Sequence, residues 1–224
     1  MTEIQDVLDR HRRMSAGRES WDSHWQALAE LLLPRRADFT GVAEAGDRRN
    51  RDQFDGTPMM AARALASAVD GLLKSRSSRW FHLRTDDRRL DEAADVKLWL
   101  EASESRLYDA LYDPQARFLQ RSAEVDLDLV IFGTGVLFVG EARGGDGLHF
   151  RSHHLKDVCV AENADGEIDT LFRTFSLTAR QAVQKWPAET LGRKLREALD
   201  RGKGDDRFAF LHAVLPREEH DPRR

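Results

Sequence analysis

The stretch Val125–Ala142, which reads VDLDLVIFGTGVLFVGEA, carries the chain from helix into sheet. Its first half is apolar apart from two aspartates, a pattern typical of the buried last turns of a helix. Its second half contains the β-branched and aromatic run Val136–Val139, which is typical of a strand. Gly133, Thr134 and Gly135 lie between the halves, and glycine adopts positive φ at little cost. We therefore expect these three residues to form a hinge between a helix and a strand.

A glycine-rich triplet is also a feature of loops that cradle phosphate. Such loops run from a strand into a helix, so that the N–H groups at the helix start face the phosphate. Here the order is reversed, because the helical pattern precedes the triplet and the strand pattern follows it. The order favours a packed junction over a phosphate site.

Composition limits the classes of function. The 224 residues include 35 basic and 39 acidic side chains, for a net charge of −4, and 41% hydrophobic residues. This balance argues against a protein held mainly by nucleic-acid phosphates, although it allows a local basic patch or a ring whose inner face repels DNA. The single cysteine, Cys159, lies in an apolar run and is expected in the core, so no disulfide framework forms within one chain.

The N-terminus is charged throughout and has no apolar signal segment. No run of residues approaches the ~20 apolar positions that a membrane span needs. We therefore expect a protein that is soluble and cytoplasmic where it is made, with no membrane contact.

The sequence before residue 133 has mainly helical periodicity. Apolar residues recur at helical spacing from the N-terminus to Pro34, and this spacing predicts that the tryptophans there face the core. Thr57 offers an N-cap, with Pro58 at the first helical position. The next expected helices span about Thr57–Leu73, Leu90–Tyr112 and Gln115–Phe132.

The sequence after residue 133 changes to strand patterns. The expected strands are Val136–Val139, Leu148–Arg151, Val158–Val160, Ile168–Phe175 and Phe208–Leu215. The Asp165-Gly166 pair predicts a hairpin, and Thr178 is expected to cap a helix that is followed by another over Ala188–Leu199. The fold class predicted is α+β, with N-terminal helices (1–132) followed by a small, mostly antiparallel sheet with C-terminal helices (133–224).

The loop over residues 34–56 carries a basic cluster at Arg48, Arg49 and Arg51. Loops of more than ~15 residues without secondary structure are usually functional or mobile. The cluster is either a solvated face or a contact for a partner or a phosphate, and a nucleic-acid-binding module of non-viral origin is the alternative function that it supports.

Catalytic motifs are absent from the sequence: it has no nucleophile elbow, Walker loop, HExxH or CxxC spacing. His153 and His154 are adjacent on an expected strand and so point to opposite faces. Asp126 and Asp128 are two apart on a helix and do not share a face. A hydrolase would have to use these aspartates with His149 and His153, and we predict no catalytic residue, metal or cofactor.

Several segments, taken in order, resemble the head-to-tail connector, or portal, proteins of podovirus-type bacteriophages. They are WDSHWQALAELLLP (Trp21–Pro34), DGTPMMAARALASAVDGLL (Asp55–Leu73), SRWFHLR (Ser78–Arg84), DLVIFGTGVLFVGE (Asp128–Glu141), VCVAENADGEIDTLFRTFSLTARQAVQKWP (Val158–Pro187) and FAFLHAVLPRE (Phe208–Glu218). The resemblance extends over about residues 18–217, and it rests on the ordered set rather than on any one segment.

The resemblance implies a structural protein that forms a ring of twelve subunits at one capsid vertex, through which double-stranded DNA is packaged and ejected. It implies no active site, and it implies terminase, scaffold, capsid and tail adaptor proteins as partners. The expected location is the virion, with the host cytoplasm during assembly. Family members are typically much longer, so the resemblance implies a wing-like region without the stem and clip.

Mixed charge on two expected helices suggests where neighbouring subunits meet. The helices over Leu90–Tyr112 and Ala188–Leu199 carry both signs of charge beside their apolar stripes. We expect their charged faces to contact adjacent subunits, with Arg193 and Arg196 in the interface.

Overall fold

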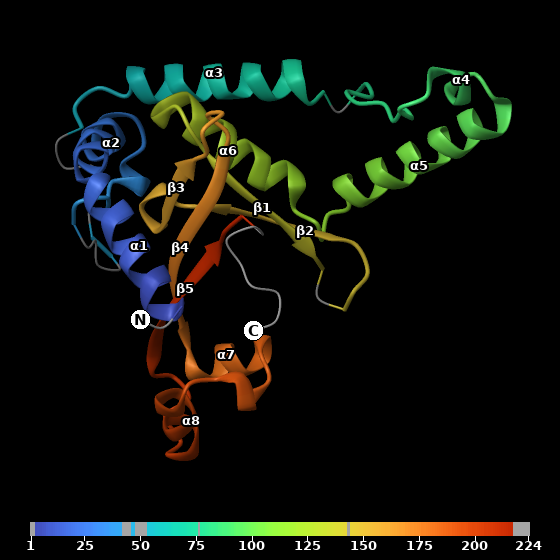
Figure 1. Cartoon of the computed structure of the whole chain (residues 1–224). Coiled ribbons are helices and arrows are strands. Elements are labelled where there is room, and N and C mark those ends of the chain that lie inside the picture. The colour runs from blue at the N-terminus through green and yellow to red at the C-terminus, as the bar shows by residue number, and fades with distance from the viewer. Residues whose placement is uncertain (1–2, 42–45, 48–52, 76, 143, 217–224) are drawn as a thin grey trace. The chain divides into compact units, whose positions relative to one another are not determined.

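The structure is a computed structural model, and it describes residues 3–41, 46–47, 53–75, 77–142 and 144–216. In chain order (Figure 1), the elements are α1 (Glu3–Gly17), α2 (Glu19–Leu32), α3 (Thr57–Leu73), α4 (Arg88–Asp91), α5 (Ala94–Tyr112), α6 (Phe118–Phe132), β1 (Val136–Glu141), β2 (Leu148–His153), β3 (Val158–Glu162), β4 (Ile168–Thr178), α7 (Ala179–Lys185), α8 (Arg193–Asp200) and β5 (Arg207–Val214). Helices followed by small antiparallel sheets and further helices confirm the predicted α+β class.

Contacts divide the chain into two compact units. One comprises residues 1–20 and 155–224, and the other comprises residues 21–154. We call them the N/C unit and the middle unit. Each takes residues from both sides of residue 132, so the units are distinct from the helical and sheet-containing halves of the sequence.

The middle unit is built around α6. Its β1 and β2 pair antiparallel, from Val136 opposite His153 to Glu141 opposite Leu148, and α6 packs on both β2 and α3. Small side chains on α3 are buried where the two helices meet. A second cluster joins Phe118 at the start of α6 to Phe150 of β2, with ring centroids 5.0 Å apart.

The N/C unit contains a three-stranded antiparallel sheet in the order β3-β4-β5, with α1 packed on β3. The Phe172 side chain of β4 is fully buried, and the ring of His11 on α1 meets it edge-on at 5.7 Å. Helices α7 and α8 form a separate small core with residues of β5. The predicted hairpin between β3 and β4 is confirmed, and Gly166 takes the positive φ of 78° that its turn requires.

The two predicted helix caps have opposite outcomes. Thr178 caps α7 with a complete capping box, in which its hydroxyl accepts from the N–H of Gln181. The prediction for Thr57 was wrong, because the N-cap position belongs to Gly56. Thr57 is already helical, and its N–H and hydroxyl donate to the carboxylate of Asp55 at 2.9 and 2.7 Å.

Three predicted helices have different bounds in the structure. The helix expected over Leu90–Tyr112 is two helices, because Ala93 is extended between α4 and α5. The one expected from Gln115 begins at Phe118, because Arg117 adopts a left-handed conformation with φ of 61°. The one expected over Ala188–Leu199 is a 3₁₀ turn followed by α8. The prediction that the N-terminal tryptophans face the core was wrong for Trp21, which is exposed.

Candidate assembly surface

The helix-to-strand junction lies between α6 and β1, where the sequence places Gly133, Thr134 and Gly135. Gly133 ends α6 with φ of 76°, and its N–H donates to the Leu129 carbonyl at 3.0 Å. A Cβ on Gly135 would lie 2.9 Å from Val125 Cγ1 and 3.0 Å from the Val125 carbonyl oxygen. Glycine is therefore needed at 133 for its conformation and at 135 for close packing.

A buried ion pair lies beside this junction. The Asp128 side chain is 0% exposed, and its Oδ2 lies 2.5 Å from Arg36 Nη1. Its Oδ1 has no hydrogen-bond partner among the described residues. Burial raises the pKa of Asp128 to about 7, against the lowering effect of the Arg36 guanidinium and with a smaller raising effect of Glu124. Asp128 is thus a carboxyl that titrates near neutrality inside the middle unit.

The segment that carries Arg36 is fixed by further polar and aromatic contacts. His154 Nε2 lies 2.9 Å from Asp38 Oδ1, and the Phe39 N–H donates to Gln26 Oε1 at 2.8 Å. The Phe39 ring packs on Phe132, the last residue of α6, at 5.4 Å. Residues 36–39 therefore contact both α6 and His154, the residue that follows β2.

A second buried pair joins α6 to the end of α3. The two Asp126 carboxylate oxygens lie 2.5 and 2.7 Å from Lys74 Nζ, which also contacts the Ser122 hydroxyl. The ammonium also lies 3.5 Å from the Asp70 carboxylate. The two aspartates of α6 therefore bind different bases, as expected for residues that do not share a helix face.

Helix α5 is held by an extended segment that runs along it. Glu104, buried on α5, accepts from the Leu83 N–H at 2.8 Å and from Arg79 Nη1 at 3.0 Å. The Leu83 N–H, with smaller contributions from His82 and Arg79, lowers the pKa of Glu104. Tyr108 adds an acceptor for the Phe81 N–H at 3.0 Å. The extended segment is thereby attached to α5 at Glu104 and Tyr108.

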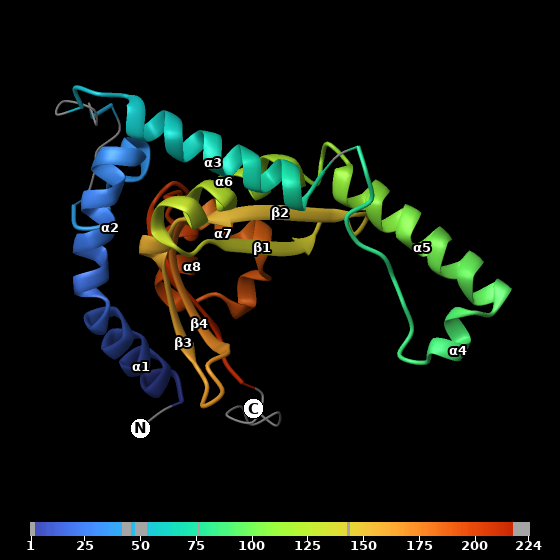
Figure 2. The same cartoon turned by 90° about the horizontal axis from the view of Figure 1, so that it is seen from above.

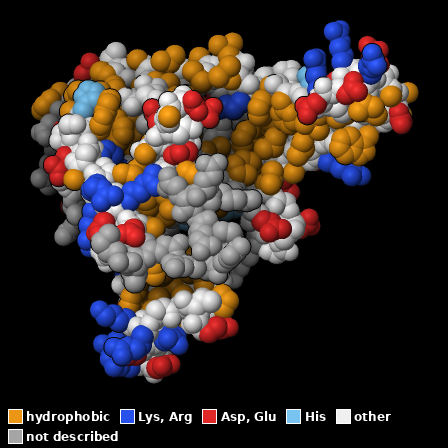
Figure 3. Space-filling model, viewed as in Figure 1, with side chains coloured by type: hydrophobic (Ala, Val, Ile, Leu, Met, Phe, Trp, Pro, Cys, Tyr) orange, Lys and Arg blue, Asp and Glu red, His pale blue; other side chains and the backbone are white. Residues whose placement is uncertain are grey.

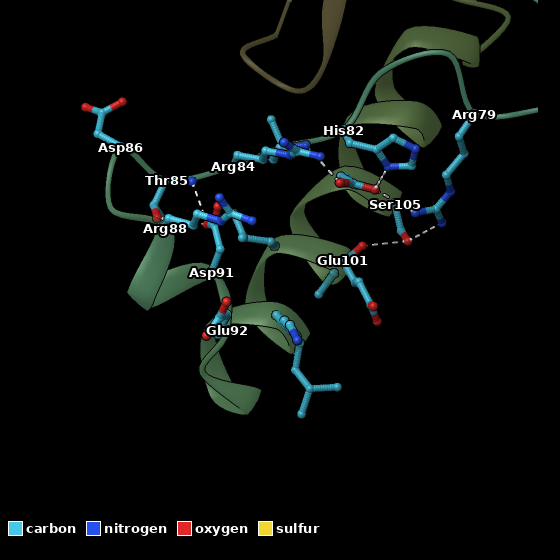
Figure 4. Close-up of a pocket in the computed structure, with 16 residues that line it drawn as sticks. Arg79, His82, Arg84, Thr85, Asp86, Arg88, Asp91, Glu92, Glu101 and Ser105 are labelled. Carbon is cyan, nitrogen blue, oxygen red and sulfur yellow. Dashed lines mark hydrogen bonds and ion pairs between the residues drawn. The ribbon is translucent and has the colours of Figure 1, made fainter.

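An open pocket of about 1190 Å³ lies beside this contact, between α4, α5 and the extended segment (Figure 4). Its lining mixes both signs of charge. The charged side chains in it include Arg84, Arg88, Lys97, Asp86, Glu92 and Glu101. Because neither sign dominates, the pocket offers no clear preference for an anion or a cation. Across the part of the chain that the structure describes, no group of three or more His, Cys, Asp or Glu is placed to hold a metal ion.

Two helices in the middle unit have faces with exposed hydrophobic side chains. Figure 3 shows hydrophobic side chains gathered over α3 and along α5. On α3 the Leu72 side chain is 84% exposed, and on α5 Leu98 and Trp99 are 68% and 67% exposed. These faces are the strongest candidates in the described chain for a contact with another protein. The sequence reading missed them, although the near absence of charge from 57 to 73 was a usable signal.

Of the remaining predicted residues, the structure describes two, both on α8 of the N/C unit. Arg193 is exposed on α8, where its Nε lies 3.4 Å from Glu197, and Arg196 is also exposed. Arg48, Arg49 and Arg51 lie outside the described residues. None of the described helices is long and apolar enough to cross a membrane.

These observations define a class of protein: an α+β protein with exposed hydrophobic side chains on two of its helices. Comparison with known proteins gives the family. The chain belongs to the bacteriophage head to tail connecting protein family, whose model matches residues 4–224. The resemblance found in the sequence is therefore confirmed.

Two curated relatives show how much of a longer protein these residues correspond to. The chain is 29% identical over 222 residues to the probable portal protein of Bordetella phage BPP-1, covering 99% of this chain and 40% of the relative. It is 28% identical over 221 residues to the portal protein of Salmonella phage epsilon15, covering 98% of this chain and 39% of the relative. The chain thus spans about two-fifths of the length of these relatives.

Proposed function

We propose that this chain is part of a structural portal subunit. It associates with copies of itself into a ring at one capsid vertex, and double-stranded DNA passes through the ring during packaging and ejection. It binds no cofactor and catalyses no reaction. The observation that carries the proposal is the family match over residues 4–224, and both relatives described above are named as portal proteins.

The physical features of the chain support this function. Contacts between two different faces of identical subunits generate closed rings when the rotation closes, and the middle unit has exposed hydrophobic side chains on two different helices. The net charge of −4 suits a channel in which DNA slides without being held by its phosphates.

The finer features of the assembly follow from the same proposal. We place twelve subunits in the ring when the protein is full length, with terminase, scaffold, capsid and tail adaptor proteins as partners. The ring is located in the virion, and in the host cytoplasm while it assembles. Gly133, Thr134 and Gly135 act as the hinge of the subunit, and Arg48, Arg49 and Arg51 contact a partner or DNA.

The charged surface of α8 is a second contact in this proposal. Arg193 and Arg196 are exposed, whereas Leu195 and Ala198 on the opposite face are buried. The double variant Arg193→Glu, Arg196→Glu should therefore lower assembly without unfolding the chain. Unchanged assembly, measured by light scattering, would remove α8 from the interface.

The mass of the purified chain in solution tests the proposed function directly. Light scattering at two protein concentrations, followed by native mass spectrometry, should show closed assemblies of defined subunit number. Negative-stain images of the same sample should show rings. A chain that stays monomeric at both concentrations would contradict self-assembly through these residues.

A further inference from the structure

The two sheets of the described chain have four outer edges, formed by β1, β2, β3 and β5. The chain itself uses two of these edges. On β2, the Phe150 N–H donates outward to the Ala116 carbonyl at 2.9 Å. On β3, the Val158 carbonyl accepts from the Arg18 guanidinium, and α1 packs on the strand. The outer edges of β1 and β5 remain.

The register shows which backbone groups of β5 point outward. The Ala179 N–H donates to the Asp206 carbonyl at 3.0 Å, and these two residues continue the β4–β5 register by one position. Hydrogen-bonded pairs alternate along an antiparallel ladder with pairs whose N–H and C=O groups point away from the partner strand. The outward groups of β5 are therefore those of Arg207, Ala209, Leu211 and Ala213. Within the described part of the chain, no further backbone hydrogen bond reaches them.

The same reasoning applies to β1. The Ala142 N–H donates to the Gly147 carbonyl at 3.0 Å and continues the β1–β2 register. The outward groups are therefore those of Leu137, Val139 and Glu141. Helix α6 packs mainly on β2, and Figure 2 shows β1 as the outer strand of the pair. The side chains of residues 137–139 are all exposed, so β1 is open on its edge and on both faces.

Neither edge carries the usual protection against strand pairing. Proteins commonly block an exposed edge with proline, lysine, an inward-pointing charge or a bulge. The β5 segment 208–214, FAFLHAV, has no proline, lysine, arginine or carboxylate, and neither does VLFVG at 136–140 of β1. Each edge is therefore a template on which a strand of another polypeptide can pair.

We propose that β5 of one copy pairs antiparallel with β1 of the next copy, with Ala209 opposite Val139. This assignment rests on the proposed function, because it names a contact by which the subunits associate. Each copy has one edge of each kind, and the two strands of one chain belong to separate sheets. A contact between two different edges leaves one of each free at the ends, so it propagates from copy to copy and can close as a ring.

The side chains of the two strands are complementary in this register. The opposed pairs are Val136–His212, Leu137–Leu211, Phe138–Phe210, Val139–Ala209, Gly140–Phe208 and Glu141–Arg207. Apolar, aromatic and opposite-charge pairs each stabilise antiparallel strands. Glu141 and Arg207 are both exposed in the single chain. A shift of two residues in either direction loses this charge pair, and one of the two shifts places Glu141 opposite Asp205 instead.

A proline on the open edge of β5 tests the contact in the full 224-residue chain. Ala209→Pro removes an N–H that points away from β4, so the β4–β5 ladder keeps its hydrogen bonds. In the contact it leaves the Val139 carbonyl without a donor, and association measured by light scattering should weaken about 10-fold to 100-fold. Ala213→Pro is the matched control, because its outward N–H lies opposite position 135, before β1 begins, and association should be unchanged. Thermal midpoints show whether both variants remain folded.

A disulfide between copies tests the register independently of the prolines. In a Cys159→Ala background, one variant carries Val136→Cys and a second carries His212→Cys. The two positions form a pair with Cα atoms about 4.5 Å apart, within disulfide range. A mixture of the two variants should therefore give a disulfide-linked heterodimer on oxidation. Val214→Cys in place of His212→Cys moves the thiol to about 7–8 Å from its target, so the yield should fall about tenfold or more.

The outcomes separate this inference from the proposed function. If the wild-type chain assembles, Ala209→Pro assembles equally well and the mixture gives no heterodimer, the strand contact is wrong while self-assembly stands. Equal loss of association in Ala209→Pro and Ala213→Pro also overturns the contact, because pairing of β5 with a second β5 would place position 213 opposite 207. A wild-type chain that stays monomeric and gives no cross-link between copies overturns both.

Discussion

Replacing Asp128 by Asn removes a titratable group from the interior of the middle unit while keeping the size of the side chain. The pKa of Asp128 is about 7 in the folded chain and 3.8 for an ordinary aspartate. The folded state therefore holds the proton more strongly than the unfolded state does. The contribution of this group to stability is fully present below about pH 4 and is lost as the pH rises to about 7.

The magnitude follows from the difference between the two pKa values. It corresponds to about 4 kcal/mol, at about 1.4 kcal/mol for each pH unit between the two values. An asparagine at position 128 does not titrate, so its contribution to the free energy of unfolding does not vary with pH. The free energy of unfolding of Asp128→Asn should therefore rise relative to wild type by up to about 4 kcal/mol between acid and neutral pH. Replacing the neutral carboxylic acid by an amide adds an offset, but that offset does not change with pH.

Urea denaturation at a series of pH values measures this difference. Both proteins share every other titrating group, so subtracting their unfolding free energies isolates residue 128. Arg36→Met is the matched perturbation: it removes the cation that lowers the pKa of Asp128, so the pH dependence should move to higher pH. The reasoning is refuted if wild type gains stability over Asp128→Asn as the pH rises, because that sign requires a pKa lowered by the ion pair.

The remaining predictions concern the packing of the middle unit. Lys74→Met leaves the buried Asp126 carboxylate without its base and should cost about 3–5 kcal/mol of stability, whereas adding Asp126→Leu should recover most of it in a double-mutant cycle. Gly135→Ala should cost about 1–3 kcal/mol, because its Cβ would lie 3.0 Å from a backbone carbonyl of α6; an unchanged urea midpoint would contradict this packing. Glu104→Gln should speed hydrogen exchange of the Leu83 amide, and equal protection in both proteins would show that this carboxylate does not hold the segment.

Local signals in the sequence predicted the parts of the fold that local interactions determine. The Asp165-Gly166 turn, the Thr178 cap and the helix-to-strand change at Gly133 each depend on residues within a few positions of one another. The break between α4 and α5 was not predicted, because it involves local hydrogen bonds that apolar spacing does not reveal. Asp87 caps α4 and Asp91 accepts from Thr85, and these contacts interrupt a pattern whose apolar spacing reads as one helix.

The buried ion pairs could not be predicted from periodicity. Lys74 and Asp126 are 52 positions apart, and Arg36 and Asp128 are 92 positions apart. An aspartate in an apolar helical run indicates only that some base is needed, and 35 basic residues are available in the chain. The family resemblance supplied the function, because the residues by themselves contain no catalytic pattern from which to argue.

The Lys74–Asp126 ion pair also explains how an alanine-rich contact keeps a defined geometry. Ala62 and Ala66 of α3 provide close packing against α6 but little shape to fix rotation or sliding. Lys74 binding to Asp126 determines how α3 lies on α6, and with it the direction in which the exposed side of α3 points. Buried charges cost stability when compared with apolar side chains, but they select one arrangement in some proteins. We infer that Lys74→Met with Asp126→Leu keeps the fold yet weakens association through the exposed side of α3, which carries Leu65 and Leu72. Undiminished association of this double variant, measured by light scattering, would show that the pair has no such role.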